Sequence, residues 1–369
     1  MKLVANLKLK PTPEQACALK ATLERCNEAC NWLSEVAFRD KIFGQYNLHK
    51  LTYREVRERF NLTAQATVRC IAKVADAYKA DKKTQRIFCK HSAQPYDERI
   101  FRFKSDNLIS IWLLDGRAVI ACATGAHQRA LLAHRKGEVD LMFVRGKWYV
   151  SCVCDFDDPK LLTPKGVLGI DMGIVNLAVD SMGERHDGAT VEARRAKFAK
   201  RRATLQRVGT RAAKKRLRKI GSRQSRFQKH QNHCISKSIV SKAERYSLGI
   251  ALENLTHIRA RVKARKEQRK RLHNWAFGHL RACIEYKAKR AGVPVVAVNP
   301  AHTSQACGEC GAINRRNRKT QSEFRCLACG HESNADENAA RNISGKGRPV
   351  TLPMFAHTCV PCAVESPVL

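Results

Sequence analysis

The sequence predicts a multidomain protein of the α/β + β class, with a small barrel-like β domain first and a larger mixed α/β domain after it. Short alternating strand patterns occur at the N-terminus and again between residues 96 and 156, with a long helical stretch between them. After residue 165, apolar strands flanked by glycine alternate with helical patterns, as in an α/β sheet. The 369 residues are enough for two or three domains.

The N-terminal region combines one strand with a helical block. Residues 6–10 alternate between polar and apolar side chains, as in a half-buried strand. A helix is expected to begin after Thr12, because proline occupies the first helical position and Gln15 completes a capping box. Apolar residues then recur at helical spacing to about Asp40, and further helical patterns follow at 53–82. The cysteines of this block fit core positions better than metal-ligand positions.

Residues 96–156 predict the body of the small β domain. Lys147–Cys154 has the pattern of a clear strand, and the Arg145-Gly146 pair before it predicts a tight turn. The strand at residues 6–10 is expected to join this sheet, which makes the helical block an insertion. Acidic residues at 155–158, followed by proline, predict a linker.

The second half of the chain alternates strands with strongly basic segments. Residues 166–183 predict two strands joined by a turn, and Tyr246–Leu255 predicts a buried strand. Between them, residues 193–230 hold sixteen Lys or Arg and no acid on a helix-compatible pattern, with one break expected at Gly221. The later elements are expected in this order: a run of eight positive residues at 259–272, a helix at 275–290, a strand at 293–298, a cysteine-rich insert, a short helix from Asp336, and a loose tail at 346–369.

The charge of the chain is unusual for a globular protein. Its 69 Lys and Arg against 33 Asp and Glu give a net charge of +36. Self-repulsion of this size favours a polyanionic partner, and nucleic acid is the natural one, although basic helices also occur simply as solvated faces. A membrane partner is not expected, because the apolar runs are strand-sized and no secretory signal is visible. Sixteen cysteines, most of them scattered singly, indicate a reduced, cytoplasmic protein.

The strongest local motif is a pair of CxxC sequences separated by fifteen residues. This spacing is typical of a zinc ribbon, in which Zn²⁺ closes a tetrahedron of thiolates between two tight turns. Gly311 and Gly330 each follow a pair and suit such turns. Zinc in a closed site of this kind is structural, so it should fold the insert and perform no chemistry. The expected ligands are Cys307, Cys310, Cys326 and Cys329.

Two further features lie near this motif. The loop between the two pairs is basic, and contact with phosphate is expected at Arg315, Arg316, Arg318 and Lys319. A third CxxC, formed by Cys359 and Cys362, lies in the tail without a second pair nearby. We interpret it as incidental.

Three acidic residues occupy unusual positions for so basic a chain. Asp171 directly follows the apolar run at 167–170, and Glu253 follows the run at 249–252 in the same way. Asp336 opens the helix after the cysteine-rich insert. Taken singly, each has a structural interpretation: Asp171 as a turn former, Glu253 as a strand end satisfied by hydrogen bonds, and Asp336 as a helix N-cap.

Taken together, the three acids predict a metal site. The ends of neighbouring strands in an α/β sheet meet at one edge, where such folds bind ligands. Carboxylates crowded there repel one another unless divalent cations neutralise them, and oxygen ligands with open positions suit Mg²⁺ or Mn²⁺. Two such ions about 4 Å apart promote phosphodiester hydrolysis. Phosphodiester cleavage is therefore the reaction that explains both the three acids and the positive charge of the chain.

Three segments resemble the TnpB family encoded by insertion sequences, relatives of the compact type V CRISPR effectors. They are GIDMGIVNLAV around Asp171, IALENL around Glu253, and TSQACGEC with CLACGHESNADENAARNI through the cysteine pairs. The resemblance covers residues 166–343 and is weaker in the N-terminal half. It implies an RNase-H-like (RuvC) mixed sheet with an inserted zinc ribbon and a catalytic triad at Asp171, Glu253 and Asp336. One departure is the segment VNPAH at 298–302, where relatives often carry an acid and an aromatic residue or arginine.

The resemblance also implies an organisation and a function. The expected domains are a wedge-like β domain at 1–10 and 94–160, a helical recognition domain at 11–93, a RuvC-like nuclease domain at 161–300 and 336–345, a zinc ribbon at 301–335 and the loose tail at 346–369. The implied function is RNA-guided cleavage of double-stranded DNA with catalytic Mg²⁺ or Mn²⁺, in a bacterial or archaeal cell, with a guide RNA as partner. The alternatives are an RNA-guided repressor or RNA-binding protein that never cuts, and a transposase that joins DNA strands. The residues carry no signal for the oligomeric state.

Overall fold

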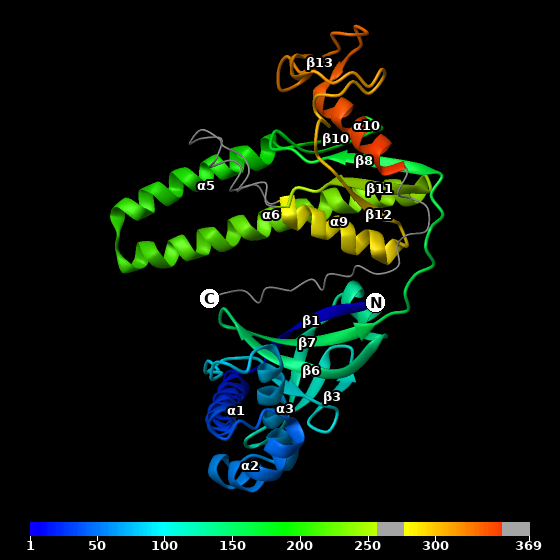
Figure 1. Cartoon of the computed structure of the whole chain (residues 1–369). Coiled ribbons are helices and arrows are strands. Elements are labelled where there is room, and N and C mark those ends of the chain that lie inside the picture. The colour runs from blue at the N-terminus through cyan, green and yellow to red at the C-terminus, as the bar shows by residue number, and fades with distance from the viewer. Residues whose placement is uncertain (257–276, 349–369) are drawn as a thin grey trace. The chain divides into compact units, whose positions relative to one another are not determined.

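The computed structural model describes residues 1–256 and 277–348, and the chain divides into two compact units, Met1–Asp157 and Asp158–Leu369. Figure 1 shows the elements of both units. The predicted basic run at 259–272 lies outside the described residues, as do Cys359, Cys362 and all of the predicted tail beyond residue 348.

The first unit is built on a seven-stranded sheet in the order β2-β6-β7-β1-β5-β4-β3, with every neighbouring pair antiparallel. The N-terminal strand β1 lies inside this sheet, between β7 and β5, and Leu7 is opposite Val150. The predicted N-terminal strand is therefore confirmed, and so is its pairing with the later strands. The strands are β1 (Lys2–Lys10), β2 (Gln94–Tyr96), β3 (Phe101–Ser105), β4 (Leu108–Leu113), β5 (Gly116–Ala123), β6 (Arg135–Val144) and β7 (Lys147–Asp155).

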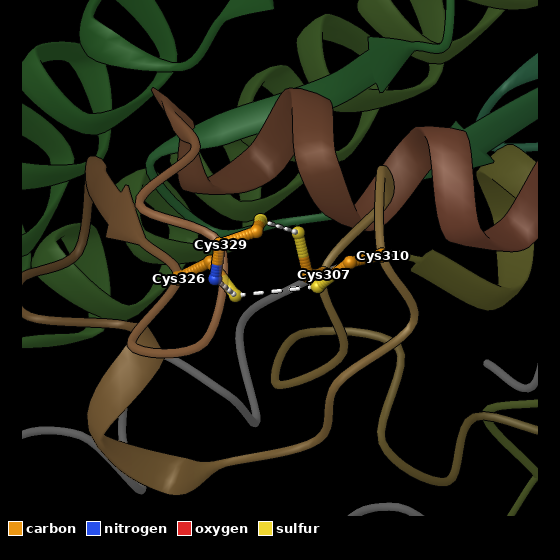
Figure 2. A group of neighbouring side chains, drawn as sticks. All are labelled: Cys307, Cys310, Cys326 and Cys329. Carbon is orange, nitrogen blue, oxygen red and sulfur yellow. Dashed lines mark hydrogen bonds between the residues drawn. The ribbon is translucent and has the colours of Figure 1, made fainter.

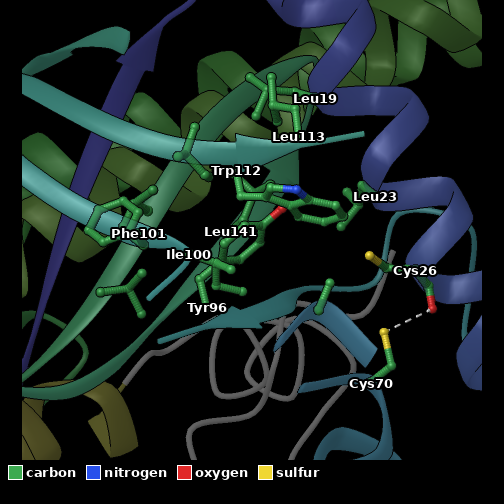
Figure 3. Close-up of a cluster of buried hydrophobic side chains, with 14 of the residues drawn as sticks. Leu19, Leu23, Cys26, Cys70, Tyr96, Ile100, Phe101, Trp112, Leu113 and Leu141 are labelled. Carbon is green, nitrogen blue, oxygen red and sulfur yellow. Dashed lines mark hydrogen bonds between the residues drawn. The ribbon is translucent and has the colours of Figure 1, made fainter. Parts of the chain in front are cut away.

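The helices of the first unit are α1 (Pro13–Arg39), α2 (Gln45–Phe60), α3 (Ala64–Ala80) and the short α4 (Ala126–Leu132). The capping box predicted for α1 is present, because the Thr12 hydroxyl accepts from the Gln15 amide and the Gln15 side chain accepts from the Thr12 amide. Apolar side chains of α1 pack against the sheet in a single core, part of which is drawn in Figure 3 with Leu19 and Leu23 facing Trp112 and Leu113.

The cysteines of the helical block divide into two groups. Cys26, Cys30 and Cys70 are buried, as predicted for core residues, and the Cys70 thiol donates to the Cys26 carbonyl at 3.7 Å (Figure 3). Burial raises the pKa of the Cys30 thiol well above its usual range, so this residue stays a neutral, apolar core side chain. Cys17 and Cys89 are exposed and are not core residues.

The second unit contains a five-stranded mixed sheet in the order β10-β9-β8-β11-β12. The three strands β8, β11 and β12 are parallel, β9 is antiparallel to β8, and β10 is antiparallel to β9. Leu168 and Ile170 face the helices α6 and α9, whereas Val167 and Ala251 face α10, so the sheet is covered on both sides. The elements are β8 (Gly166–Asp171), β9 (Asn176–Asp180), β10 (Arg185–Asp187), β11 (Leu248–Glu253), β12 (Val295–Val298), α6 (Arg211–Arg245), α9 (Phe277–Ala291) and α10 (Ala335–Gly347). The last helix thus ends at Gly347, two residues into the segment predicted as a tail.

The basic segment after β10 forms two helices, and the predicted position of the break between them is wrong. Helix α5 (Ala189–Val208) ends at Gly209, which has a left-handed φ of 66°, and α6 begins after Thr210, whose side chain accepts from the Ala213 amide. Gly221 lies inside α6, because a solvent-exposed glycine weakens a helix without necessarily ending it. Within the described residues, no helix is both long and apolar enough to cross a membrane.

Candidate active site and metal centre

Asp171 and Glu253 end two neighbouring parallel strands. In the pairing of β8 with β11, Ile170 is opposite Leu252, so the acid that follows on each strand lies at the same edge of the sheet. The apolar residues before each acid are buried on both faces, which is why the strands end where the first charged side chain occurs. Asp171 is half-buried and Glu253 is 8% exposed.

Helix α10 brings the third acid, Asp336, to the same edge. The helix packs closely against β8 at Gly169, where an added Cβ would lie 2.1 Å from the Ala340 carbonyl oxygen. The suggestion that Asp336 caps this helix is wrong: Asn334 is the cap, and its side chain accepts from the amides of Asp336 and Glu337. The carboxylate of Asp336, which is 6% exposed, is therefore available for the site.

The three acids interact through their charges. Burial, followed by the charges of Glu253 and Asp336, raises the pKa of the Asp171 carboxyl to about 7, against the opposing effect of Arg318. Burial also raises the pKa of Glu253. The ligand atoms of the triad are farther apart than those of a closed metal site. Among the described residues, the triad is not one of the groups whose ligand atoms all lie within 4.8 Å of one another. The carboxylates therefore meet at one edge without converging on a single point.

Three neighbouring side chains, which we did not predict from the sequence, hold two of the carboxylates. Arg318 from the cysteine-rich insert pairs with one oxygen of Asp336 at 2.9 Å, and Asn176 donates to the other oxygen at 2.9 Å. The hydroxyl of Thr303 donates to Glu253. Arg318, one of the four residues expected to contact phosphate, donates to a carboxylate of the triad in this structure.

Only one of these three positions had a sequence signal. Asn176 begins β9, five residues after Asp171, and a polar residue at that position is close in sequence to the predicted site. Arg318 is one of four positive residues within a five-residue stretch, and nothing in that pattern distinguishes it from its neighbours. Thr303 becomes relevant only when the chain after β12 turns back toward β11.

The raised pKa of Asp171 predicts a pH-dependent stability. The unfolded carboxyl has a pKa of about 3.9, so protonation stabilises the folded chain fully below that pH, and this contribution is lost as the pH rises through the folded value of about 7. In magnesium-free buffer, the Tm of the wild type should therefore fall between these pH values, and Asp171→Asn should show a flatter profile with a higher Tm at pH 8. Thermal unfolding across this range, with exposed Asp115→Asn as the control, is the measurement. Identical profiles for the wild type and Asp171→Asn would contradict the assignment.

The four cysteines of the insert converge from two similar turns. Their Sγ atoms all lie within 4.8 Å of one another, and Figure 2 shows the four side chains pointing toward one centre. In each turn the glycine after the pair has a left-handed φ, 77° at Gly311 and 72° at Gly330, and its amide donates to the carbonyl of the first cysteine at 3.0 Å. An amide hydrogen bond from Cys329 lowers the pKa of the Cys326 thiol to about 6. A tetrahedral ion with sulfur ligands, as Zn²⁺ prefers, fits this donor set.

The insert is fastened to the triad through α10. Asn338 accepts from the Gly308 amide at 2.8 Å and donates to the Ala306 carbonyl at 2.8 Å, and both partners adjoin the first cysteine of the insert. Asn338 is two residues from Asp336 on the same helix. The folded state of the insert is therefore coupled to the position of one acid and, through Arg318, to the charge beside it.

Removing one thiolate should release zinc. Cys326→Ser is expected to lower the zinc content of the purified chain by about one ion, because three ligands hold a structural ion far more weakly than four. It should also increase hydrogen exchange in α10. The measurement is elemental analysis beside the exposed-cysteine control Cys89→Ser. Unchanged zinc in Cys326→Ser would refute the four-cysteine site.

Two sequence families match the chain between residues 151 and 343. The family OrfB_IS605, described as "Probable transposase", matches residues 151–256, which include Asp171 and Glu253. The family described as "Cas12f1-like, TNB domain" matches residues 277–343, which include the four cysteines and Asp336. The relatives of the chain include a TnpB-like protein of Methanocaldococcus jannaschii, 36% identical over 135 residues, which cover 36% of this chain and 48% of that protein.

The chain is thus similar to a TnpB-like protein and to the transposase and Cas12f1-like families that match it.

Other proteins to which the chain is similar are CRISPR-associated nucleases by name. The CRISPR-associated endodeoxyribonuclease Cas12f1 of Sulfoacidibacillus thermotolerans is 34% identical over 218 residues, covering 54% of this chain and 50% of that protein. The chain thus spans about half the length of the curated relatives that it matches. A solved Cas12f1 complex with single guide RNA and target DNA aligns over 93% of this chain and 99% of that chain, at 18% identity and a TM-score of 0.41. A TM-score that low does not by itself establish a shared fold.

Proposed function

We propose that this protein is an RNA-guided DNA endonuclease, which cuts a double-stranded target at a metal-dependent site formed by Asp171, Glu253 and Asp336. The observation that supports this most directly is the gathering of the three acids at one edge of the sheet, with the pKa of Asp171 raised by burial and by the other two charges. A buried, crowded group of acids is costly unless cations neutralise it. The similarity to proteins named as an endodeoxyribonuclease and as a TnpB-like protein supports the same reaction.

The donor set suits Mg²⁺ or Mn²⁺. Three carboxylates offer hard oxygen ligands, and the neighbouring side chains fix their direction: Asn176 and Arg318 orient Asp336, and Thr303 orients Glu253. When bound, such ions would supply an activated water and neutralise charge on the scissile phosphate. Arg318 supplies a fixed positive charge beside Asp336, where it would attract the phosphate backbone toward the site.

We also propose the finer architecture that goes with this reaction. The five-stranded sheet with α6, α9 and α10 would be a RuvC-like nuclease domain of the RNase-H type, and the insert with Cys307, Cys310, Cys326 and Cys329 would be a zinc ribbon with a structural Zn²⁺. The first unit would serve as the wedge-like and recognition parts, which contact the RNA and the DNA duplex. Base pairing would then select most of the target while the protein contacts the backbone and a short flanking motif. The reaction would take place in the cytoplasm, where prokaryotic DNA lies.

The α5–α6 hairpin is the proposed contact surface for nucleic-acid backbone in the second unit. Of its sixteen Lys and Arg between residues 193 and 230, all but Arg195 are exposed, with no acid among them. The two helices are held together by Arg195 with Gln228 at 2.9 Å and by Arg202 with Gln224 at 2.6 Å. The Arg194 guanidinium also packs over the Phe227 ring at 4.3 Å. The contacts between the two helices therefore use three of the positive side chains, which leaves most of the charge facing solvent.

A copurification experiment tests the proposal. The chain is expressed together with its native flanking DNA, and the RNA that copurifies with it is sequenced. A discrete RNA species is expected, and the purified complex should cut a duplex that matches part of this RNA in the presence of Mg²⁺. Recovery of heterogeneous cellular RNA alone would count against a dedicated guide. Tight binding to the matched duplex without cutting would favour the repressor.

A further inference from the structure

A second group of metal-binding side chains lies between α6 and α9, away from the triad and the cysteine-rich insert. It consists of His233 on α6 and of His279 and Cys283 on α9, and their ligand atoms all lie within 4.8 Å of one another. The Cys283 sulfur is 3.6 Å from Nδ1 of His279 and 3.8 Å from Nδ1 of His233. His279 and Cys283 are four residues apart, so both face the same side of α9.

We propose that His233, His279 and Cys283 bind a Zn²⁺ ion that links α6 to α9. Imidazole nitrogen and thiolate sulfur are the ligands that Zn²⁺ prefers, whereas Mg²⁺ and Ca²⁺ take oxygen. Cys283 is buried, His279 is half-buried and His233 is exposed, so the ion would lie at the surface end of the helix interface. Three protein ligands leave one tetrahedral position open to water or to an exogenous ligand.

Polar groups already contact the ring nitrogens that face the Cys283 sulfur. The side-chain amide of Asn232 lies 3.0 Å from Nδ1 of His279, and the Tyr286 hydroxyl lies 3.3 Å from Nδ1 of His233, so an ion bound through Nδ1 would have to displace them. On His279 the other nitrogen, Nε2, lies 3.9 Å from the same sulfur and could bind the ion while Asn232 orients the ring. Burial and nearby positive groups lower the pKa of both histidines, which keeps the rings neutral and able to donate a lone pair.

Neighbouring positive charges, Lys287 and Lys229, oppose the ion and lower the expected affinity. The ammonium of Lys287 donates to the His233 carbonyl and to the Ser236 hydroxyl. A fixed positive charge so close to the cluster weakens the binding of a cation. The four-cysteine site of the insert has four thiolate ligands, whereas this cluster has only one. The site between α6 and α9 should therefore lose its zinc at a lower chelator concentration than the four-cysteine site.

The ion would reinforce an interface that already contributes to the core. Ile235 and Ile239 of α6 pack with Leu280 and Ile284 of α9 in the cluster that covers one face of the sheet. His279 is in the first turn of α9, so a bond to the ion would fix the start of this helix against α6. Zinc bound to the folded state alone raises the free energy of unfolding by mass action.

The test is a comparison of zinc contents in the full-length chain. The wild type should hold about two Zn²⁺ and His233→Gln about one, because losing one of three ligands removes the ion. His233 is exposed, so its replacement should leave the fold intact. Cys234→Ser, which changes an exposed cysteine of α6 outside the cluster, is the matched control and should keep both ions.

Cobalt substitution identifies the ligand directly. In a Cys326→Ser background, which disables the four-cysteine site, Co²⁺ should give a thiolate-to-metal charge-transfer band, and adding Cys283→Ser should remove it. Two outcomes would overturn this proposal. One is an equal zinc content in the wild type and in His233→Gln, and the other is a Cys326→Ser variant that holds no zinc at all. Neither outcome would affect the proposed nuclease, since its acids are in a different place.

Discussion

Replacing Asp171 with alanine is expected to abolish DNA cleavage while RNA and target binding remain largely intact. The carboxylate would hold the catalytic ions, whereas the affinity for nucleic acid comes from many exposed positive charges elsewhere. The expected loss of cleavage rate is about 10⁴-fold or more, the scale observed when one member of a catalytic unit is removed. Glu253→Ala and Asp336→Ala should behave alike, and double variants should add little.

Cleavage and binding must be measured on the same substrate. A duplex matched to the copurified RNA is digested with Mg²⁺, with Mn²⁺ and without divalent ions, and a gel shift follows binding in parallel. Asp115→Ala, at an exposed turn of the first unit, is the control and should cut like the wild type. Full cutting by Asp171→Ala would refute the triad, and loss of binding in that variant would show that the acid supports the fold instead.

Neutralising one face of the α5–α6 hairpin should cause a large loss of affinity for RNA. Each positive side chain that contacts a phosphate releases counterions, so replacing four of them should reduce the slope of log Kd against log salt by up to about four. The loss of affinity should be greatest at low salt. The proposed variant replaces four exposed residues of α6 with glutamine: Lys214, Lys215, Arg218 and Lys219.

A charge-preserving variant separates charge from structure. Exchanging lysine for arginine, and arginine for lysine, at the same four positions keeps the charge and the helix and should leave the salt slope nearly unchanged. Filter binding of the copurified RNA at several salt concentrations gives both slopes. An unchanged slope in the glutamine variant would mean that this face of the hairpin is solvated and contacts no phosphate.

Much of the fold could be predicted from the periodicity of apolar residues and from the residues that end the strands. The alternation at residues 6–10 and the capping box at Thr12 are local signals, and both are present in the structure. The buried runs before Asp171 and Glu253 predicted that these acids end strands, and the parallel pairing of β8 with β11 brings them to one edge. The pairs of cysteines likewise converge because their spacing and the following glycines permit two tight turns.

The features that were missed depend on contacts between distant segments. The break after α5 was placed at Gly221 because a glycine followed by serine resembles a helix end, yet the Gly209-Thr210 pair supplies both the left-handed cap and the next N-cap. The role of Asn334 required knowing where α10 begins. The contacts of Arg318 and Thr303 arise only after the insert folds back on the sheet, so no local pattern predicts them.

The length of the α5–α6 hairpin limits the length of nucleic-acid duplex that it can contact. The 20 residues of α5 extend for about 30 Å at 1.5 Å per residue. The neighbouring part of α6 runs beside α5 in the antiparallel direction, and one turn of double-stranded DNA is about 34 Å long. The positive surface is therefore close to one helical repeat of a duplex. A duplex of one turn would occupy its whole length, and a longer one would have to continue onto other parts of the protein.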